Sequence, residues 1–201
     1  LKGVGIEAMK SLEHERESNG TFKDLYDLAE RVDPKAINKK CLEQLARAGA
    51  LDTLEANRAS ALLAAPTLAS IASSAEADRA GGQGGLFGDA EPAIRAALPQ
   101  APAWNSQTKL DHEFGAVGFY FSGHPLDDVL DGIDENRITL AMDLEENAVN
   151  DKPLELVGVV RKRDERPSRN GGKFAFITLS DPTGEIELIV QPEMLHIVRD
   201  K

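Results

Sequence analysis

The sequence predicts an α+β fold, in which a small helical domain and a flexible linker precede part of a small antiparallel β-barrel. Three observations support this prediction. Apolar residues recur at helical spacing in residues 1–58, glycines and prolines are concentrated in residues 81–106, and apolar and polar residues alternate from residue 154 onward. Helical, irregular and strand patterns therefore follow one another along the chain.

Residues 1–58 are predicted to form three short helices joined by glycine corners. A helix ends readily where glycine adopts a left-handed backbone, and it begins readily at a side chain that accepts hydrogen bonds from the first turn. Thr21, with Asp24 three residues later, resembles a capping box, and Asn38 is expected to cap the third helix. The other boundaries are expected at Gly5, at Asn19-Gly20, before Asp33-Pro34 and at Gly49.

The first glycine corner, Gly3-Val4-Gly5, is a candidate DNA-contacting hairpin of a helix-hairpin-helix domain. Glycines let the backbone approach a phosphate, and the free N–H groups at the start of a helix can bind its oxygens. Lys2 and Lys10 could add positive charge beside it. Such contacts do not depend on base sequence. The alternative interpretation is an ordinary corner before a helix.

Residues 59–80 are predicted to extend the helical domain, and residues 81–106 are predicted to form a flexible linker. Alanine-rich sequence favours a helix in the extension, although Pro66 should kink or divide it. The glycine-rich start of the linker cannot build a core, because the backbone entropy lost there has little apolar burial to offset it.

Gln83, Leu86 and Phe87 form a candidate partner-binding motif within this linker. An extended peptide of this form places two apolar side chains in a hydrophobic pocket of a partner, while the amide fixes its register. Burial of the two apolar side chains supplies roughly 3 to 6 kcal/mol against an association cost of about 4 kcal/mol or more, so this contact alone binds weakly. This weak contact contributes to binding when a second site on the same protein is also occupied. The alternative is a linker with two incidental apolar residues.

Residues 107–150 are predicted to form a helical segment. Its helix should end at Ser122-Gly123, because His124-Pro125 cannot continue it. Acidic residues then crowd the stretch from Asp127 to Asp151. A metal cluster among these carboxylates is one interpretation, and a solvated acidic face is the simpler one.

Residues 151–201 are predicted to be the first part of an OB-fold, with its final strands beyond Lys201. Three strands of alternating pattern, a turn sequence between each pair and a helix after the third strand follow in the order of that barrel. Gly158 inside the first strand suggests a bulge or a sharp coil of the strand. The strands are expected at 154–160, 174–179 and 185–190, the turns at 170–172 and 181–184, and the helix at 194–199.

The predicted first hairpin carries a candidate surface for single-stranded DNA, a basic turn made of Arg161, Lys162, Arg163, Arg166, Arg169 and Lys173. Like charges this close repel one another unless an anion is near, although Asp164 and Glu165 partly offset them. Phe174 and Phe176 share a strand face beside these cations and resemble the stacking platform of a single-strand binder. Because one face of each strand must fill the barrel, a core position is the simpler interpretation for both phenylalanines.

Composition and charge narrow the classes of function. The chain has 201 residues and a formal net charge of -11, which argues against a general DNA-binding surface and in favour of local contacts. One cysteine excludes an internal disulfide framework. No apolar run has the length of a membrane span and the first residues are not a secretory signal, so a soluble cytoplasmic protein without a membrane partner is expected.

The sequence predicts no enzyme active site and no metal site. It has no phosphate-binding glycine loop followed by Lys-Ser/Thr and no nucleophile elbow, and its histidines show no ligand spacing with Cys41. The chain begins at Leu1 without an initiator methionine, and is expected to be a piece of something larger.

The order of these parts resembles the alpha subunit of the bacterial replicative DNA polymerase III, in its region after the polymerase fingers. The resemblance covers nearly the whole chain, and it rests on a combination of motifs that is far more specific than any one of them. The motifs are 2–5, 21–28, 38–40, 48–52, 83–88, 118–126 and 178–181.

This resemblance implies a tandem helix-hairpin-helix that grips duplex DNA, an internal motif that binds the sliding clamp and an OB-fold near the single-stranded template. It assigns Gln83, Leu86 and Phe87 to the clamp contact and the Gly3-Val4-Gly5 hairpin to DNA. The second hairpin, near Gly49, lacks the Gly-x-Gly of the first. The whole polymerase would be a nucleotidyltransferase that uses Mg²⁺ and contacts other replicase subunits. Its metal-binding aspartates have no counterpart here, so no cofactor is expected in this segment.

The expected function is retention of DNA and attachment to the sliding clamp within a replicative DNA polymerase, by linked binding and not by catalysis. A free-standing DNA repair or recombination adaptor built from the same modules is the alternative. An acidic scaffold without DNA affinity is a third possibility, which a salt series on primed DNA would test.

Overall fold

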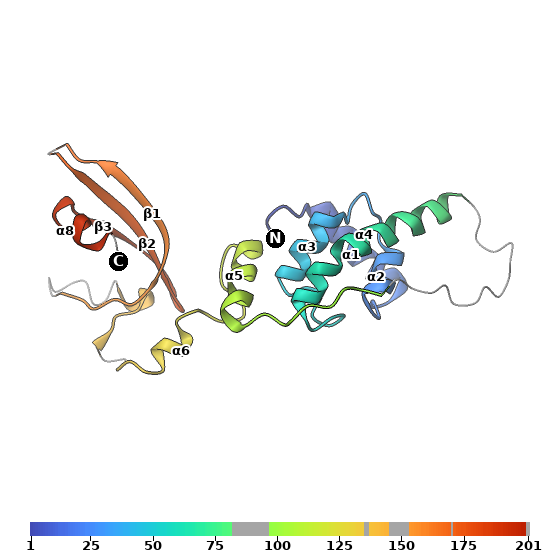
Figure 1. Ribbon diagram of the computed structural model, residues 1–201, viewed down its shortest axis with the longest axis horizontal. Coiled ribbons are helices and arrows are strands. Elements are labelled where there is room, and N and C mark those ends of the chain that lie inside the picture. The colour runs from blue at the N-terminus through green and yellow to red at the C-terminus, as the bar shows by residue number, and fades with distance from the viewer. Residues whose placement is uncertain (82–96, 135–136, 145–152, 170, 200–201) are drawn as a thin grey trace. The chain divides into compact units, whose positions relative to one another are not determined.

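The computed structural model describes residues 1–81, 97–134, 137–144, 153–169 and 171–199. Contacts between Cα atoms divide the chain into two compact units, Leu1–Phe121 and Ser122–Lys201. Figure 1 shows that the first unit is helical and that the second is built around a sheet. The predicted α+β class is confirmed.

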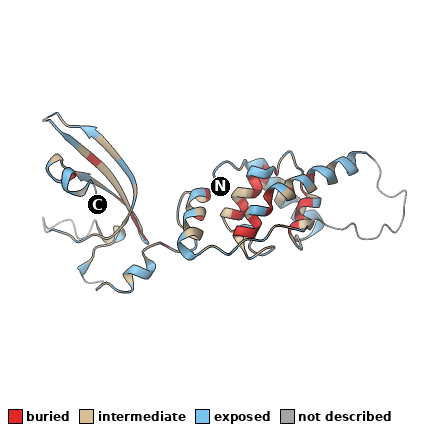
Figure 2. Ribbon diagram, in the orientation of Figure 1, coloured by how far each residue is buried: buried red, intermediate tan, exposed pale blue. Residues whose placement is uncertain are grey.

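The first unit is a bundle of short helices around a core rich in leucine and alanine. Its helices are α1 (Ile6–Asn19), α2 (Leu25–Arg31), α3 (Lys39–Arg47), α4 (Arg58–Ala80) and α5 (Ser106–Val117). α2 and α3 both pack against α4, and α5 packs against α3. Figure 2 shows the buried residues gathered on the inner faces of these helices. The largest buried side chains of this core are Leu28, Ile37, Leu42 and Leu68.

α4 is an integral part of this core and not an extension beside it. Its buried face includes Ala61, Ala64, Ala65, Leu68 and Ala72. Small side chains on that face let α2 and α3 approach closely. The helix continues through Pro66, so the expected division there is wrong. Pro66 lies on the exposed side, where the helix gives up only the backbone hydrogen bond that residue 66 would donate to the Leu62 carbonyl.

One predicted helix cap is confirmed and another is displaced. The Asn38 side chain caps α3, because it accepts a hydrogen bond at 3.0 Å from the amide three residues later. α2 is capped by Asp24 and not by Thr21: Asp24 accepts from the Asp27 amide at 2.7 Å, while Asp27 accepts from the Lys23 amide at 2.9 Å. The cap therefore lies three residues later than predicted, and the Asp27 side chain accepts from the amide of the residue before the cap.

α5 ends earlier than the predicted boundary at Ser122-Gly123. It stops at Val117, and Gly118 then adopts a φ of 105°, which turns the chain back. Tyr120 packs against Phe114 after this turn, with the ring centroids 4.9 Å apart. The helix therefore ends at a left-handed glycine before the prolyl residue can interrupt it.

The chain that leads into α5 is bound to α4, although the sequence predicts a flexible linker up to residue 106. The Ala101 amide donates to Ser60 Oγ at 3.0 Å, and Asn57 Nδ2 donates to the Ala101 carbonyl at 2.6 Å. Leu98 packs against the helical core. Residues 97–105 therefore belong to the first unit, and the candidate motif at Gln83, Leu86 and Phe87 lies outside the described residues.

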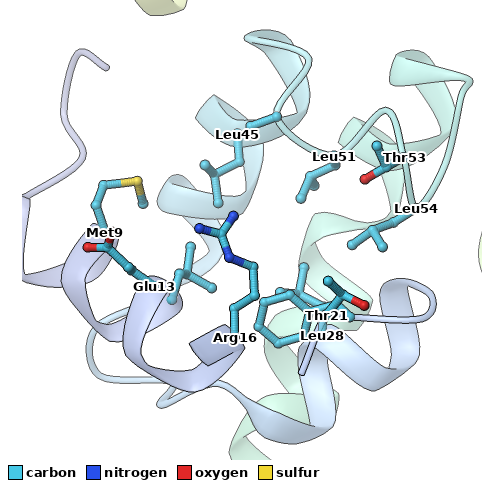
Figure 3. Close-up of a pocket in the computed structure, with 12 residues that line it drawn as sticks. Met9, Glu13, Arg16, Thr21, Leu28, Leu45, Leu51, Thr53 and Leu54 are labelled. Carbon is cyan, nitrogen blue, oxygen red and sulfur yellow. The ribbon is translucent and has the colours of Figure 1, made fainter. Parts of the chain in front are cut away.

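An apolar cleft of about 490 Å³ lies between α1 and the rest of the helical core (Figure 3). Buried leucines of α2, α3 and the following turn form its floor, namely Leu28, Leu45 and Leu51. Met9 and Arg16 reach into it from α1. α1 contributes a single buried side chain, Ala8, and therefore covers the core less completely than the other helices do.

The second unit contains a three-stranded antiparallel sheet in the order β1-β2-β3. The strands are β1 (Val159–Pro167), β2 (Lys173–Asp181) and β3 (Gly184–Val190), and the other elements are α6 (Asp127–Leu130), the 3₁₀ helix η2 (Ala141–Asp143) and α8 (Pro192–Val198). The predicted antiparallel meander and the helix after the third strand are confirmed. Asp181 stabilises the second turn by accepting hydrogen bonds from the amides of Thr183 and Gly184 at 2.7 and 3.0 Å.

The first strand begins later than predicted, at Val159 and not at Leu154. Gly158 lies so close to β2 that an added Cβ would stand 2.8 Å from Leu179 Cβ, so glycine is needed there for close approach. The irregularity in the ladder falls between Val160 and Lys162. The bulge expected at Gly158 is therefore displaced into the basic segment.

The strand register assigns side chains to two distinct faces of the sheet. One face is apolar and carries Ala175 and Ile186, which are both buried. α8 covers this face, since Arg199 at its end binds Glu165, the cross-strand partner of Ala175. Lys162, Phe176 and Thr178 lie on the opposite face.

The chain ahead of the sheet is fixed to β2 by a buried histidine. His124 Nε2 lies 3.0 Å from Ser180 Oγ, and His124 Nδ1 accepts a hydrogen bond from the Leu126 amide at 3.1 Å. Because Nδ1 is an acceptor, the neutral ring carries its proton on Nε2 and donates to Ser180. Burial lowers the pKa of His124, which favours this neutral form.

Cys41 is buried in the first unit, and burial raises the pKa of its thiol. Among the helices of the described ranges, none is both long enough and apolar enough to cross a membrane.

Candidate nucleic-acid interface

The open face of the sheet carries a groove of about 210 Å³ that combines an aromatic ring with positive charge. Cross-strand neighbours place Lys162 opposite Thr178 and Glu187, and Phe176 lies between Asp164 and Ile189. The lining residues are Lys162, Asp164, Arg166, Phe176, Thr178 and Glu187. These come from all three strands, so the sheet itself sets the spacing of the groove.

Phe176 is the centre of this arrangement. The Arg166 guanidinium carbon lies 5.0 Å from the Phe176 ring centroid, and the Phe174 ring stands edge-on to Phe176 with centroids 5.4 Å apart. Both phenylalanines are half-buried on the open face, so the core position favoured for them by the sequence is wrong. A ring with a guanidinium beside it can stack a nucleobase and attract its phosphate.

Asp164 holds the Arg166 side chain in place over the ring. Arg166 Nη2 lies 2.7 Å from Asp164 Oδ2, and its Nε lies 3.1 Å from the same oxygen. The pair is partly exposed, so it contributes little to folding but limits the rotamers of Arg166. The carboxylate also reduces the local positive charge, and the groove has a second exposed cation in Lys162.

The six predicted cations do not form one basic turn. Arg161, Lys162, Arg163 and Arg166 lie within β1, whereas Arg169 lies in the connection to β2 and Lys173 begins that strand. The register sends Arg163 to the face covered by α8, where it lies 2.7 Å from Glu165. The strand period thus separates cations that are neighbours in the sequence.

Glu165 pairs with the cationic side chains of the covered face. Hydrogen bonds from Arg199 and then Arg163 lower the pKa of the Glu165 carboxyl below its usual range. Lys173 Nζ lies 3.8 Å from the same carboxylate. Arg163 and Lys173 are therefore paired on the covered face, whereas Lys162 and Arg166 are the predicted DNA-contacting residues that line the groove, with Arg166 paired to Asp164 there.

The predicted N-terminal hairpin forms a tight turn before α1. Gly3 has a φ of 74°, and Gly5 caps α1 with extended backbone while its carbonyl accepts from the Ala8 amide at 3.2 Å. An added Cβ on Gly3 would lie 3.3 Å from Cε of Lys40, at the start of α3. The turn therefore brings Lys40 beside the exposed start of a helix, where backbone N–H groups favour an anion.

The lysines near this hairpin have different surroundings. Lys2 Nζ lies 5.5 Å from the Phe114 ring centroid, and the Lys2 amide donates to the Ala116 carbonyl at 2.7 Å, so Lys2 is held against α5. Lys10 lies 3.1 Å from Glu7 in an exposed pair. Lys40 is distant from this turn in the sequence, and only the structure brings the two together.

The second hairpin is filled by a side chain of the protein itself. Gly49 has a φ of 78°, and an added Cβ would lie only 2.1 Å from Arg58 Nη2. Arg58 in turn binds Asp52 through Nε and Nη2 at 2.8 to 3.0 Å. The guanidinium therefore occupies the space beside the Gly49 backbone, and it is already bound to a carboxylate there.

Comparisons with known proteins agree with this division into two nucleic-acid modules. A family model for the helix-hairpin-helix motif matches residues 1–61, and a model for an OB-fold nucleic acid binding domain matches residues 154–201. The first match contains both glycine turns and the start of α4, and the second contains the three strands and α8.

Curated relatives match the chain from end to end. The DNA polymerase III subunit alpha of Caulobacter vibrioides (strain NA1000 / CB15N) is 45% identical over 201 residues, which make up 100% of this chain and 18% of that protein. The protein of the same name from Neisseria meningitidis serogroup A is 36% identical over 201 residues, 100% of this chain and 17% of that protein. The one from Vibrio cholerae is 31% identical over 200 residues, 97% of this chain and 17% of that protein.

The fold, the groove and the family matches define a nucleic-acid-binding segment that joins a helix-hairpin-helix module to an OB-fold module. Along its whole length this segment is homologous to the DNA polymerase III alpha subunits, which confirms the resemblance predicted from the sequence. The chain spans less than a fifth of the length of these relatives.

Proposed function

We propose that this chain is a non-catalytic segment of a replicative DNA polymerase that holds DNA and attaches it to the sliding clamp. The groove of Lys162, Arg166 and Phe176 on the open sheet face carries this proposal. It joins a stacking surface to positive charge, which is the combination that binds single strands without sequence preference. Homology to the DNA polymerase III alpha subunits supports DNA as the ligand.

Duplex DNA is proposed to bind at the Gly3-Val4-Gly5 turn. The positive φ of Gly3, the start of α1 and the nearby Lys40 side chain support a phosphate contact there. The filled Gly49 turn supports a contact at the first hairpin alone. Because the net charge of the chain is -11, DNA affinity must come from such local sites and will be modest for each one.

The sliding clamp is proposed to bind Gln83, Leu86 and Phe87, and the support for this is their sequence pattern. When one of two weak sites on a chain is occupied, the effective concentration of the other partner near its own site rises. The clamp contact and the DNA contacts therefore strengthen one another without any new interaction. Other replicase subunits are further proposed partners of the whole polymerase. Retention of DNA by linked binding is the mechanism that these parts allow.

The groove is tested by fluorescence anisotropy with a labelled oligothymidylate at fixed salt. Phe176→Leu keeps apolar bulk but removes the ring, and base stacking is worth about 1 to 3 kcal/mol, so affinity should fall by roughly 5-fold to 150-fold. Phe119→Leu, at an exposed phenylalanine of the other unit, is the matched control and should bind like the unmodified chain. An equal loss of affinity in both variants, or no loss in Phe176→Leu, contradicts the groove as the DNA-binding site.

The clamp contact is tested separately by calorimetry with the purified sliding clamp. The double change Leu86→Ala/Phe87→Ala should abolish heat of binding while circular dichroism remains unchanged. Unchanged binding, or no binding by either protein, would remove the clamp from the proposal but leave the DNA groove untouched. A repair or recombination adaptor built from the same modules would be favoured if the intact gene product contained no polymerase domain.

A further inference from the structure

A pocket of about 380 Å³ lies on the first unit, away from the glycine turn that is proposed to bind duplex DNA. Its walls are mostly aliphatic and come from α3, α4, the 101–104 segment and α5. The residues that matter for its chemistry are Arg47, Leu62, Leu63, Pro66, Trp104 and His112. Leu63 is 51% exposed, so its apolar side chain is accessible to a ligand.

Arg47 supplies the positive charge of this pocket. It is the last residue of α3, and its Nε is buried without a hydrogen-bond acceptor among the described residues. A buried charged donor without an acceptor destabilises the unbound state, so an acceptor that arrives with a ligand is favoured strongly. Glu43 also lines the pocket, but it pairs with Lys39 at 3.7 Å.

Trp104 and His112 form the aromatic wall. Their rings stack with centroids 4.0 Å apart and an angle of 22° between the planes. The pKa of His112 is lowered by burial and next by the positive charge of Arg47, while Asp111 acts in the opposite direction. The imidazole is therefore largely neutral at neutral pH, and Arg47 supplies the cationic group that lines the pocket.

The proline in α4 adds a backbone acceptor to the same wall. Pro66 has no N–H, so the helical hydrogen bond to the Leu62 carbonyl cannot form. Both residues line the pocket. A guanidinium donor, a carbonyl acceptor and apolar walls together match an extended peptide better than a nucleobase, because Trp104 already stacks on His112 and the other apolar walls, at Leu62, Leu63 and Pro66, are aliphatic.

We propose that this pocket docks a peptide segment of a partner protein, through one bulky apolar side chain and an adjacent carboxylate that binds Arg47. The apolar side chain lies between Leu63, Pro66 and Trp104. The carboxylate supplies the acceptor that Arg47 lacks. None of the residues that line this pocket belongs to the DNA groove or to the clamp motif.

The test is an NMR titration of the full 201-residue chain with N-acetyl-phenylalanine and, separately, with its uncharged amide. Both compounds should shift the Trp104 indole N–H signal saturably. The acid should bind about tenfold more tightly than the amide, as expected for a hydrogen bond to a charged group. Arg47→Met should make the two affinities equal, and Leu63→Ser, on the exposed side, should weaken both.

Arg16→Met is the matched control, because Arg16 lines the separate apolar cleft under α1. This variant should keep the tenfold preference for the acid. The pKa of His112 should rise when the acid binds, since the carboxylate offsets the charge of Arg47, and should not rise with the amide. Loss of the preference in Arg16→Met, or shifts confined to Met9 and Leu45, would assign binding to that cleft and overturn the proposal.

Peptides can then replace the amino-acid derivative. A random peptide display selection against the chain should enrich a bulky apolar residue next to Asp or Glu, and the enriched peptides should not bind Arg47→Met. No saturable shift of Trp104 with either compound would overturn the proposal. A larger Trp104 shift with oligothymidylate than with the acid would also overturn it, in favour of a nucleic-acid site.

Discussion

Glu113 and Arg58 form an ion pair whose carboxylate is completely buried. Glu113 Oε2 accepts a hydrogen bond from Arg58 Nη1 at 3.1 Å, and Glu113 Oε1 accepts one from the Phe121 amide at 2.7 Å. Arg58 also binds Asp52 in the turn after α3. One guanidinium therefore joins that turn and the start of α4 to α5, which is distant from both in the sequence.

Removal of either partner should destabilise the first unit. Glu113→Ala leaves the Arg58 charge without its buried partner, and breaking such a pair costs about 3 to 5 kcal/mol of unfolding free energy. Urea unfolding followed by Trp104 fluorescence measures this. Glu17→Ala, at an exposed carboxylate of α1, is the control and should change the free energy by less than about 0.5 kcal/mol. Equal stability of the two variants would contradict a structural role for the pair.

Gly49 should be intolerant of any side chain. Alanine there needs a left-handed backbone and displaces Arg58, whose Nη2 would lie 2.1 Å from the new Cβ, so a loss of about 2 kcal/mol or more is expected. Gly115→Ala should have the opposite effect, because Gly115 lies inside α5 with open space around it. That change should stabilise the unit by about 0.5 to 1 kcal/mol. Thermal unfolding of both variants distinguishes strain from a general effect of alanine.

The second unit should lose stability as the pH falls below about 6.5, the pKa of histidine in an unfolded chain. Burial lowers the pKa of His124 in the folded protein, so the unfolded state takes up the proton first. The stabilisation of the second unit by neutral His124 is complete above pH 6.5. It is lost as the pH falls through the lowered pKa of His124 in the folded protein. Asp127 and Asp181 oppose this shift, and Arg161 adds to it.

His124→Asn should reduce this dependence on pH. Melting of the β2 amide signals, followed by NMR at pH 7.5 and pH 5, gives the stability of the second unit in each protein. The loss of stability between pH 7.5 and pH 5 should be smaller in His124→Asn than in the unmodified chain. The exposed His14→Asn change should leave this loss unaltered. The same difference in all three proteins would show that other groups determine the acid response.

Lys162 and Arg163 are neighbours in sequence but should differ in their effect on DNA binding. Lys162 lies in the groove, whereas Arg163 lies on the opposite sheet face beside Glu165. Lys162→Ala should lower the slope of log affinity against log salt for single-stranded DNA by about 0.7. Arg163→Ala should leave the slope unchanged. A similar change in both would show that the basic segment acts as a diffuse charge.

The sequence is most informative where the pattern is local. Asn38, the turn at Asp181 and the helix after β3 could all be predicted, because a cap, a turn and an apolar stripe depend on residues a few positions apart. β1 begins later than the sequence predicts, since the apolar run before Gly158 resembles a strand although the basic residues after it form the ladder. Polar strands of this kind are recognised only through their partner strand.

Long-range contacts account for what sequence reasoning missed in the site. Nothing local shows that Lys40 lies beside Gly3 or that Arg58 fills the Gly49 turn, because those contacts join separate helices. The sorting of Lys162 and Arg163 to opposite faces depends on the bulge between Val160 and Lys162. A shift of one residue in that bulge would exchange the faces of the cations.

Cys41 gives the chain a built-in reporter of its own motions. It is the single cysteine of the sequence, it lies in the helical core, and burial raises the pKa of its thiol. A closed core therefore protects it from alkylating reagents, which attack the thiolate. Its rate of alkylation measures how often the first unit opens around α3, and DNA or a docked peptide that stabilises the unit will slow that rate.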